Sequence, residues 1–109
     1  MSDFHEIISA LIKFRDERDW DQFHNPKDLA IALNIESSEL LELFLWKPAE
    51  EADAEKVKAE LADVLSFAFL LANKYGFDIR EIVLDKIRQN ETKYPADKAR
   101  GTSKKYNEL

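Results

Sequence analysis

ESSELLELFLWKPAEEADAEKVKAELAD, residues 36–63, is the stretch that decides the fold. On both sides of Pro48 the apolar residues recur at the three- and four-residue spacing of a helix face, and no part of the chain alternates apolar and polar residues over the length of a strand. Because a proline disfavours helical backbone in the residue before it, the helix must break near Pro48. We therefore expect an antiparallel pair of helices within an all-α fold.

Capping and stop signals predict four helices in total. Short polar side chains cap helix starts, whereas glycine and proline mark helix ends. The expected starts lie at the caps Asp3, Asn25, Asp53 and Asp78. The expected ends lie before the loop at Asp19, at about Trp46, at Gly76 and before Pro95.

A length of 109 residues suits a single domain. We expect residues 1–95 to form a four-helix domain and residues 96–109 to form a basic C-terminal tail. The tail holds four basic residues against two acidic ones, a balance that suits an anionic ligand.

The composition excludes several classes of protein. The chain has no cysteine, which removes disulfides, zinc fingers, iron–sulfur clusters and thiol nucleophiles. Its two glycines, Gly76 and Gly101, lie too far apart for a dinucleotide- or phosphate-binding loop. A net charge of −6 and the lack of a long apolar run argue against a binder of nucleic-acid polymers and against a membrane protein. We therefore expect a cytoplasmic protein.

The acidic charge is concentrated in residues 36–63. These residues hold nine acidic and three basic side chains, so they carry a charge equal to the net −6 of the whole chain. Glu36 and Glu39 on the second helix, and Glu60 and Asp63 on the third, are pairs three residues apart, and each pair shares a helix face. Folding the hairpin about Pro48 brings the pairs level with each other. We therefore expect four carboxylates to converge between two helices.

Converging carboxylates need a cation, because like charges at short range repel one another. The donors are all oxygen, which favours Mg²⁺, with Mn²⁺ as a substitute, and Mg²⁺ commonly binds substrate phosphates as well. The alternative is a solvated acidic face whose acids pair with lysines along the same helix. The second helix, however, offers no basic residue between Asp28 and Trp46 for such pairing.

Five motifs follow one another along nearly the whole chain. They occupy residues 17–24, 36–47, 60–65, 90–96 and 99–106. This set and its order resemble the MazG-like all-α nucleoside triphosphate pyrophosphohydrolases, and within them the dCTP pyrophosphatase type. The resemblance implies a Mg²⁺-dependent hydrolase that cleaves (deoxy)nucleoside triphosphates between the α and β phosphates, releases the monophosphate and pyrophosphate, and removes non-standard or excess dNTPs, with dCTP-like substrates among the candidates.

The resemblance also implies roles for the four acids. Glu36, Glu39, Glu60 and Asp63 match the Mg²⁺ ligands of the family and are the catalytic residues that we expect. The bound ions polarise the phosphates and lower the pKa of a water molecule, and one of the four carboxylates is a candidate general base.

Contacts to the substrate are expected from other segments. Trp20 and Trp46 match aromatic positions that stack on the base. Lys86, Asn90 and Lys93 on the fourth helix are the candidate phosphate contacts, because phosphoryl-type transition states spread negative charge over several oxygens.

Two positions near the base depart from the family's pattern. Leu11 stands where the mammalian-type enzyme has a histidine on the first helix, and Phe67 stands where it has a tyrosine. Both changes remove polar contacts near the base, so the resemblance does not extend to strict cytosine selectivity.

The competing hypothesis is a non-catalytic helical dimerisation or regulatory module with a vestigial metal site. A vestigial site should have lost at least one ligand, whereas all four acids are present here. We expect a homodimer, or a homotetramer formed by two dimers, because a chain this short cannot cover all the apolar surface of its long helices.

Overall fold

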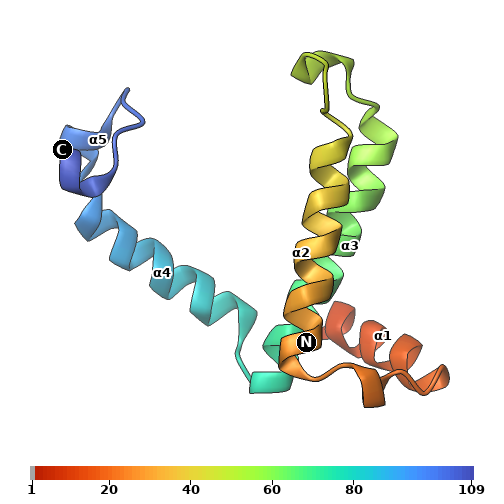
Figure 1. Cartoon of the computed structure of the whole chain (residues 1–109). Helices are drawn as coiled ribbons and strands as arrows, with labels where there is room; N and C mark the ends of the chain where they lie inside the picture. The colour runs from red at the N-terminus through yellow and green to blue at the C-terminus, as the bar shows by residue number, and fades with distance from the viewer. Residues whose placement is uncertain (1) are drawn as a thin grey trace. The chain divides into compact units, whose positions relative to one another are not determined.

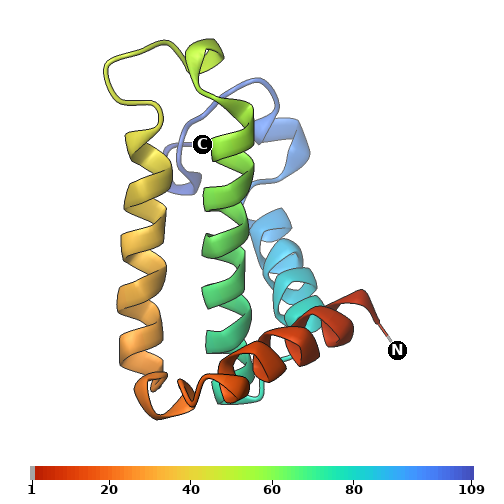
Figure 2. The ribbon, with the colours of Figure 1, turned by 90° about the vertical axis from the view of Figure 1, so that its right-hand side faces the viewer.

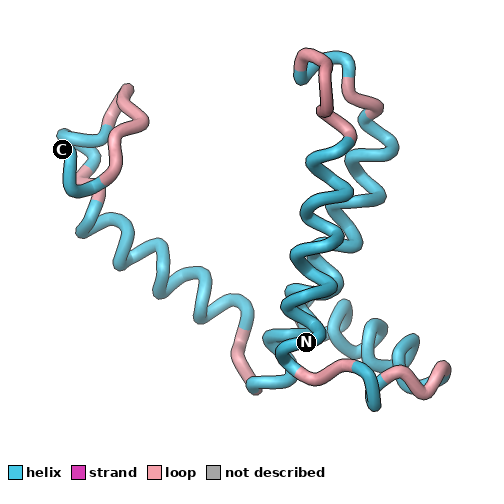
Figure 3. The backbone as a smooth tube through the Cα atoms, in the orientation of Figure 1, coloured by secondary structure: helices cyan, strands magenta, loops and turns pink. Residues whose placement is uncertain are grey.

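The computed structural model describes residues 2–109, which contain helices and loops but no strand (Figure 1, Figure 3). The long helices are α1 (Asp3–Glu17), α2 (Pro26–Glu42), α3 (Ala54–Tyr75) and α4 (Ile79–Lys93). The short elements are α5 (Ala96–Ala99) and the 3₁₀ turns η1 (Asp21–Phe23), η2 (Ala49–Glu51) and η3 (Tyr106–Glu108). The all-α prediction is confirmed, and the predicted tail contains a short helix. None of the helices described is both long enough and apolar enough to cross a membrane.

Local capping explains where the helices begin. The side-chain oxygens of Asn25, Asp53 and Asp78 accept hydrogen bonds from backbone N–H groups at 2.9–3.0 Å. These three residues are the helix caps that the sequence predicted. The prediction for the first helix is wrong by one residue, because the hydroxyl of Ser2 is the cap and Asp3 is already helical. An acidic residue in the first turn is still favourable there, since it interacts with the positive end of the helix dipole.

The end of α2 differs from the prediction. The helix stops at Glu42 rather than near Trp46. Residues 43–45 donate to the carbonyl oxygen three residues back, at 3.0–3.2 Å, which tightens the chain out of α-helical geometry. Trp46 then takes a left-handed backbone with φ of 61°, and Pro48 follows. The helix therefore ends about one turn before the predicted end near Trp46.

The chain divides into two compact units, the first ending at Phe77 and the second running from Asp78 to Leu109. In the first unit α2 and α3 lie side by side and antiparallel, and α1 crosses the end of this hairpin that is distant from Pro48 (Figure 1, Figure 2). We call that end the base and the end at residues 43–53 the tip. The buried apolar residues of the described chain, Leu29, Leu70 and Ala72, all lie toward the base.

The second unit is organised by its own aromatic contacts. Tyr94 and Tyr106 pack edge to face with ring centroids 6.2 Å apart, which joins the end of α4 to the C-terminal turn η3. Gly76, just before this unit, ends α3 in a left-handed conformation with φ of 70°, as predicted. The boundary at residue 95 between a domain and a tail stays a prediction.

Candidate active site

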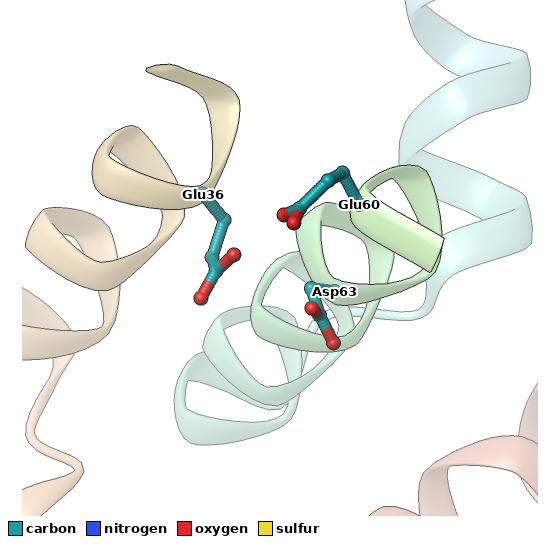
Figure 4. Close-up of side chains that lie close together, drawn as sticks. All are labelled: Glu36, Glu60 and Asp63. Carbon is teal, nitrogen blue, oxygen red and sulfur yellow. The ribbon is translucent and has the colours of Figure 1, made fainter. Parts of the chain in front are cut away.

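Three carboxylates meet between α2 and α3. One oxygen atom each of Glu36, Glu60 and Asp63 lies within 4.8 Å of the other two. Figure 4 shows Glu36 reaching from α2 toward the two acids on α3. Glu36 and Glu60 are half-buried and Asp63 is exposed. The antiparallel packing of α2 on α3 therefore brings together acids that are far apart in sequence.

Glu39 lies at the edge of this group. Among residues 2–109, the set of acids within 4.8 Å contains the other three predicted ligands but not Glu39. Its carboxylate is nevertheless close enough for its charge and hydrogen bonding to raise the pKa of Glu36, which lies one turn earlier on α2. Three of the four predicted ligands thus form a tight cluster, and the fourth adjoins it.

The cluster is electrostatically unfavourable without a cation. Burial raises the pKa of Glu36 to about 7, and the hydrogen bonding and charge of Glu39 and the charge of Asp63 act in the same direction. Oε2 of Glu36 and Oε2 of Glu60 are buried, and no donor from the described residues reaches them. Buried carboxylate oxygens without a donor are costly. These oxygens therefore have the chemistry of ligands for a divalent metal ion.

A cavity of about 370 Å³ opens beside the acids within the first unit. Glu36 and Asp63 form its acidic side. Its apolar walls include Leu11, Phe14, Trp20, Phe67 and Leu70. Such a cavity suits a ligand that has a charged part next to a flat apolar part.

The two predicted tryptophans lie in different places. Trp20 lines the cavity, is 44% exposed, and packs edge to face on Phe14 with ring centroids 5.8 Å apart. Trp46 is 93% exposed at the tip of the hairpin and is not among the residues that line this cavity. Of the two predicted tryptophans, Trp20 is the one placed to stack on a ligand in the cavity of the first unit.

Both departures from the family's pattern also line the cavity. Leu11 faces it from α1 and Phe67 faces it from α3. Phe67 contacts the ring of His24 edge to face at 6.4 Å. The cavity wall is therefore apolar at the two positions where the resemblance led us to look for lost polar contacts.

Sequence reasoning missed Arg15 and favoured a structural or exposed His24 over a polar contact, yet both residues line the cavity. The side chain of Arg15 is only 11% exposed. Its position, four residues after Leu11 and three after Ile12, falls on the apolar stripe of α1, so the spacing carried a signal for a buried arginine. Burial, and then the charges of Arg15 and Lys74, lower the pKa of His24.

The candidate phosphate contacts belong to the second unit. Lys86, Asn90 and Lys93 are exposed on α4. Nζ of Lys93 lies 5.1 Å from the ring centroid of Tyr106. Their role in binding phosphate stays a prediction.

Comparison with known proteins finds consistent similarities. A model of the MazG-like family matches residues 31–109. The chain is 42% identical over 105 residues to dCTP pyrophosphatase 1 of Homo sapiens and 39% identical over 105 residues to that of Bos taurus, which covers 89% of this chain and 62% of each relative. The chain thus spans about three fifths of the length of these mammalian relatives. The crystal structure of a pyrophosphatase from Archaeoglobus fulgidus aligns with a TM-score of 0.81 and 35% identity, over 87% of this chain and 94% of that one.

Proposed function

The chain belongs to the MazG-like family, and from that premise we propose that it hydrolyses (deoxy)nucleoside triphosphates between the α and β phosphates. The products are a nucleoside monophosphate and pyrophosphate, and the role is the removal of non-standard or excess dNTPs. One observation carries the proposal: Glu36, Glu60 and Asp63 place oxygen atoms within 4.8 Å of one another at the edge of an aromatic cavity. The pyrophosphatases among its relatives support the same reaction.

We assign the metal to Glu36, Glu39, Glu60 and Asp63, and the ion to Mg²⁺, with Mn²⁺ able to replace it. The support is an all-oxygen donor set in which two buried carboxylate oxygens have no donor from residues 2–109. When bound, Mg²⁺ polarises phosphate oxygens and lowers the pKa of water. The ionised carboxylates would hold the ion. A carboxylate of this set that does not bind the ion is placed to accept a proton.

The remaining residues of the proposal bind the substrate. Trp20 stacks on the base inside the cavity, and the apolar walls exclude water around it. Lys86, Asn90 and Lys93 contact the phosphates. Because Trp46 is 93% exposed and outside the cavity of its own chain, its proposed stacking role requires sites near a border between subunits.

We propose a homodimer, or a homotetramer formed by two dimers. Large apolar side chains exposed along the hairpin support it, since Ile31, Leu41 and Leu45 are 47%, 71% and 55% exposed. Light scattering at micromolar concentration is expected to show more than one chain per particle. A monomer would contradict both the assembly and the role of Trp46.

The decisive experiment identifies the products. Incubation with Mg²⁺ and a panel of common NTPs and dNTPs is expected to release pyrophosphate and monophosphate. Glu39→Gln should abolish turnover and weaken Mg²⁺ binding while leaving the helical content unchanged. Glu42→Gln, an exposed acid on the same helix, is the matched control and should retain activity.

Other outcomes would revise the proposal in distinct ways. Release of orthophosphate and diphosphate would indicate a different phosphatase chemistry on the same acids. No turnover of any nucleotide would favour the non-catalytic regulatory module. Activity that survives in Glu39→Gln would remove Glu39 from the metal site. The cytoplasmic location stays a prediction.

A further inference from the structure

The loop between α1 and α2 carries two residues of the cavity wall and is only partly buried. Trp20 and His24 line the cavity, whereas Phe23 between them is 62% exposed. The only regular element in this part of the described chain is the single 3₁₀ turn η1. The rings of Trp20 and His24 contact Phe14 and Phe67, but the exposed Phe23 adds no such contact, so polar contacts contribute to holding the loop in place.

One carboxylate oxygen connects this loop to two helices. Oδ1 of Asp21 lies 2.5 Å from Nζ of Lys74, in the last turn of α3, and 3.2 Å from Nη1 of Arg15, on α1. The hydrogen bond from Lys74 is the main cause of a lowered pKa at Asp21, so the carboxylate is charged at neutral pH. The side chain of Arg15 is only 11% exposed and therefore needs an anionic partner.

Backbone hydrogen bonds connect these ion-paired residues to the cavity residues. The N–H of Trp20 donates to the carbonyl oxygen of Arg15 at 3.1 Å, and the N–H of His24 donates to that of Asp21 at 3.0 Å. Asp19, at the start of the loop, has a left-handed φ of 55°, a conformation that surrounding contacts must maintain. Because Asp21 follows Trp20 in the chain and its carbonyl oxygen accepts the N–H of His24, displacement of Asp21 would disturb both cavity residues.

We propose that Asp21 is a positioning residue that holds Trp20 and His24 in the cavity wall for binding of the base. The inference rests on the proposed function, because it assumes that a nucleotide base occupies the cavity. Asp21 touches neither the acids of the metal site nor the proposed substrate. It acts through the two residues that it places.

The kinetic test compares two carboxylates that share one arginine. The side chain of Asp16 also contacts Arg15, at 2.9 Å, but Asp16 lies within α1, and this ion pair does not involve the loop. Asp21→Asn is expected to raise the KM for the preferred triphosphate roughly five- to tenfold, as loss of one charge-assisted hydrogen bond would, with little change in kcat. Asp16→Asn should leave KM within about twofold of the parent value. Asp21→Glu, which keeps the charge, should recover part of the loss.

A second readout needs no substrate. In a Trp46→Phe background, Trp20 is the one tryptophan left, so the tryptophan fluorescence reports on Trp20 alone. Asp21→Asn is expected to make Trp20 more accessible to acrylamide quenching, and Asp16→Asn is not. Circular dichroism and thermal unfolding check that each variant is folded. Should Asp21→Asn fail to fold, Lys74→Gln removes the 2.5 Å contact, leaves the partner of Arg15 intact, and should give a smaller change in the same direction.

The outcomes separate this proposal from the function on which it rests. Equal quenching of Trp20 in Asp21→Asn and Asp16→Asn, or equal KM values, would overturn the positioning role even if the parent protein releases pyrophosphate. Selective quenching in Asp21→Asn without any nucleotide turnover would support the positioning role and contradict the proposed function. A fall in kcat without a rise in KM would also overturn the proposal, because Asp21 would then affect the chemical step rather than binding.

Discussion

Leucine residues are buried at the base of the α2–α3 hairpin and exposed toward its tip. At the base, Leu29 is fully buried and Leu70 is 6% exposed. Toward the tip, Leu41 is 71% exposed and Leu45 is 55% exposed. α1 crosses only the base, and the loop that follows α1 adds the cavity wall there. An apolar residue at helical spacing therefore becomes core only where a third element covers the hairpin.

This difference places the candidate chemistry toward the covered side. Glu36 and Asp63 line a cavity whose other walls come from α1, the loop after it and the part of α3 at residues 66–70. The tip carries acids as well, including Glu50 and Glu51, but they are exposed in the turn η2. Acids of the same charge thus have two different environments, and substitutions in the two regions should have effects of different size.

The largest expected effect is on catalysis in the cluster. Glu60→Gln should lower the rate of pyrophosphate release by about 10²- to 10³-fold, because it removes a proposed ligand of the ion that would polarise the phosphates. Glu50→Gln, the same change at the tip, should leave the rate unaltered. Equal losses in the two variants would show that the cluster is not the reacting site.

The next effect is on stability. Leu29→Ala should lower the free energy of unfolding by about 2–5 kcal/mol, because it leaves a cavity in a fully buried position. Leu41→Ala, at a position that is exposed in the single chain, should change it by less than about 0.5 kcal/mol unless the proposed assembly covers it. Urea unfolding of the two variants measures both values. A large loss in Leu41→Ala would mean that an assembled partner covers the helix toward the tip.

A third effect depends on pH. The pKa of Glu36 is raised from 4.5 to about 7 in the folded protein, so between these values the folded state binds more protons than the unfolded chain. The free energy of unfolding of the metal-free protein should therefore fall as pH rises from about 4.5 to about 7. Glu36→Gln should reduce this slope and make the metal-free protein more stable at pH 8, where wild-type Glu36 is ionised. Parallel stability curves for the two proteins would contradict the raised pKa.

The smallest effect concerns the backbone at the tip. Trp46 has a φ of 61°, where a side chain is strained and glycine is not. Trp46→Gly should therefore be more stable than Trp46→Ala by about 1 kcal/mol, although glycine is the more flexible residue when unfolded. Thermal unfolding of the two variants provides the comparison. An alanine variant as stable as the glycine variant would show that the turn relaxes to another conformation.

Features that depend on a few neighbouring residues were predictable. Three of the four helix caps, the glycine end of α3 and the absence of strands from residues 2–109 follow from local hydrogen bonding and side-chain spacing. The clustering of Glu36 with Glu60 and Asp63 was also predictable, because an antiparallel hairpin relates residues at equal distances from its turn. The end of α2 was not, since Pro48 indicates only where a helix cannot continue.

The sequence by itself determined which segments are helical, where most of them begin, and which acids can face one another across a turn. These properties are local or follow from the symmetry of a hairpin. Only the tertiary structure decided that Arg15 and His24 join Trp20 in one cavity, that Trp46 lies outside it, and that Glu39 stands at the edge of the cluster. The first depends on how α1 and its loop cross the hairpin, and the other two depend on how α2 packs on α3 and on where α2 ends. These arrangements are set by the combined packing of residues distant in the chain.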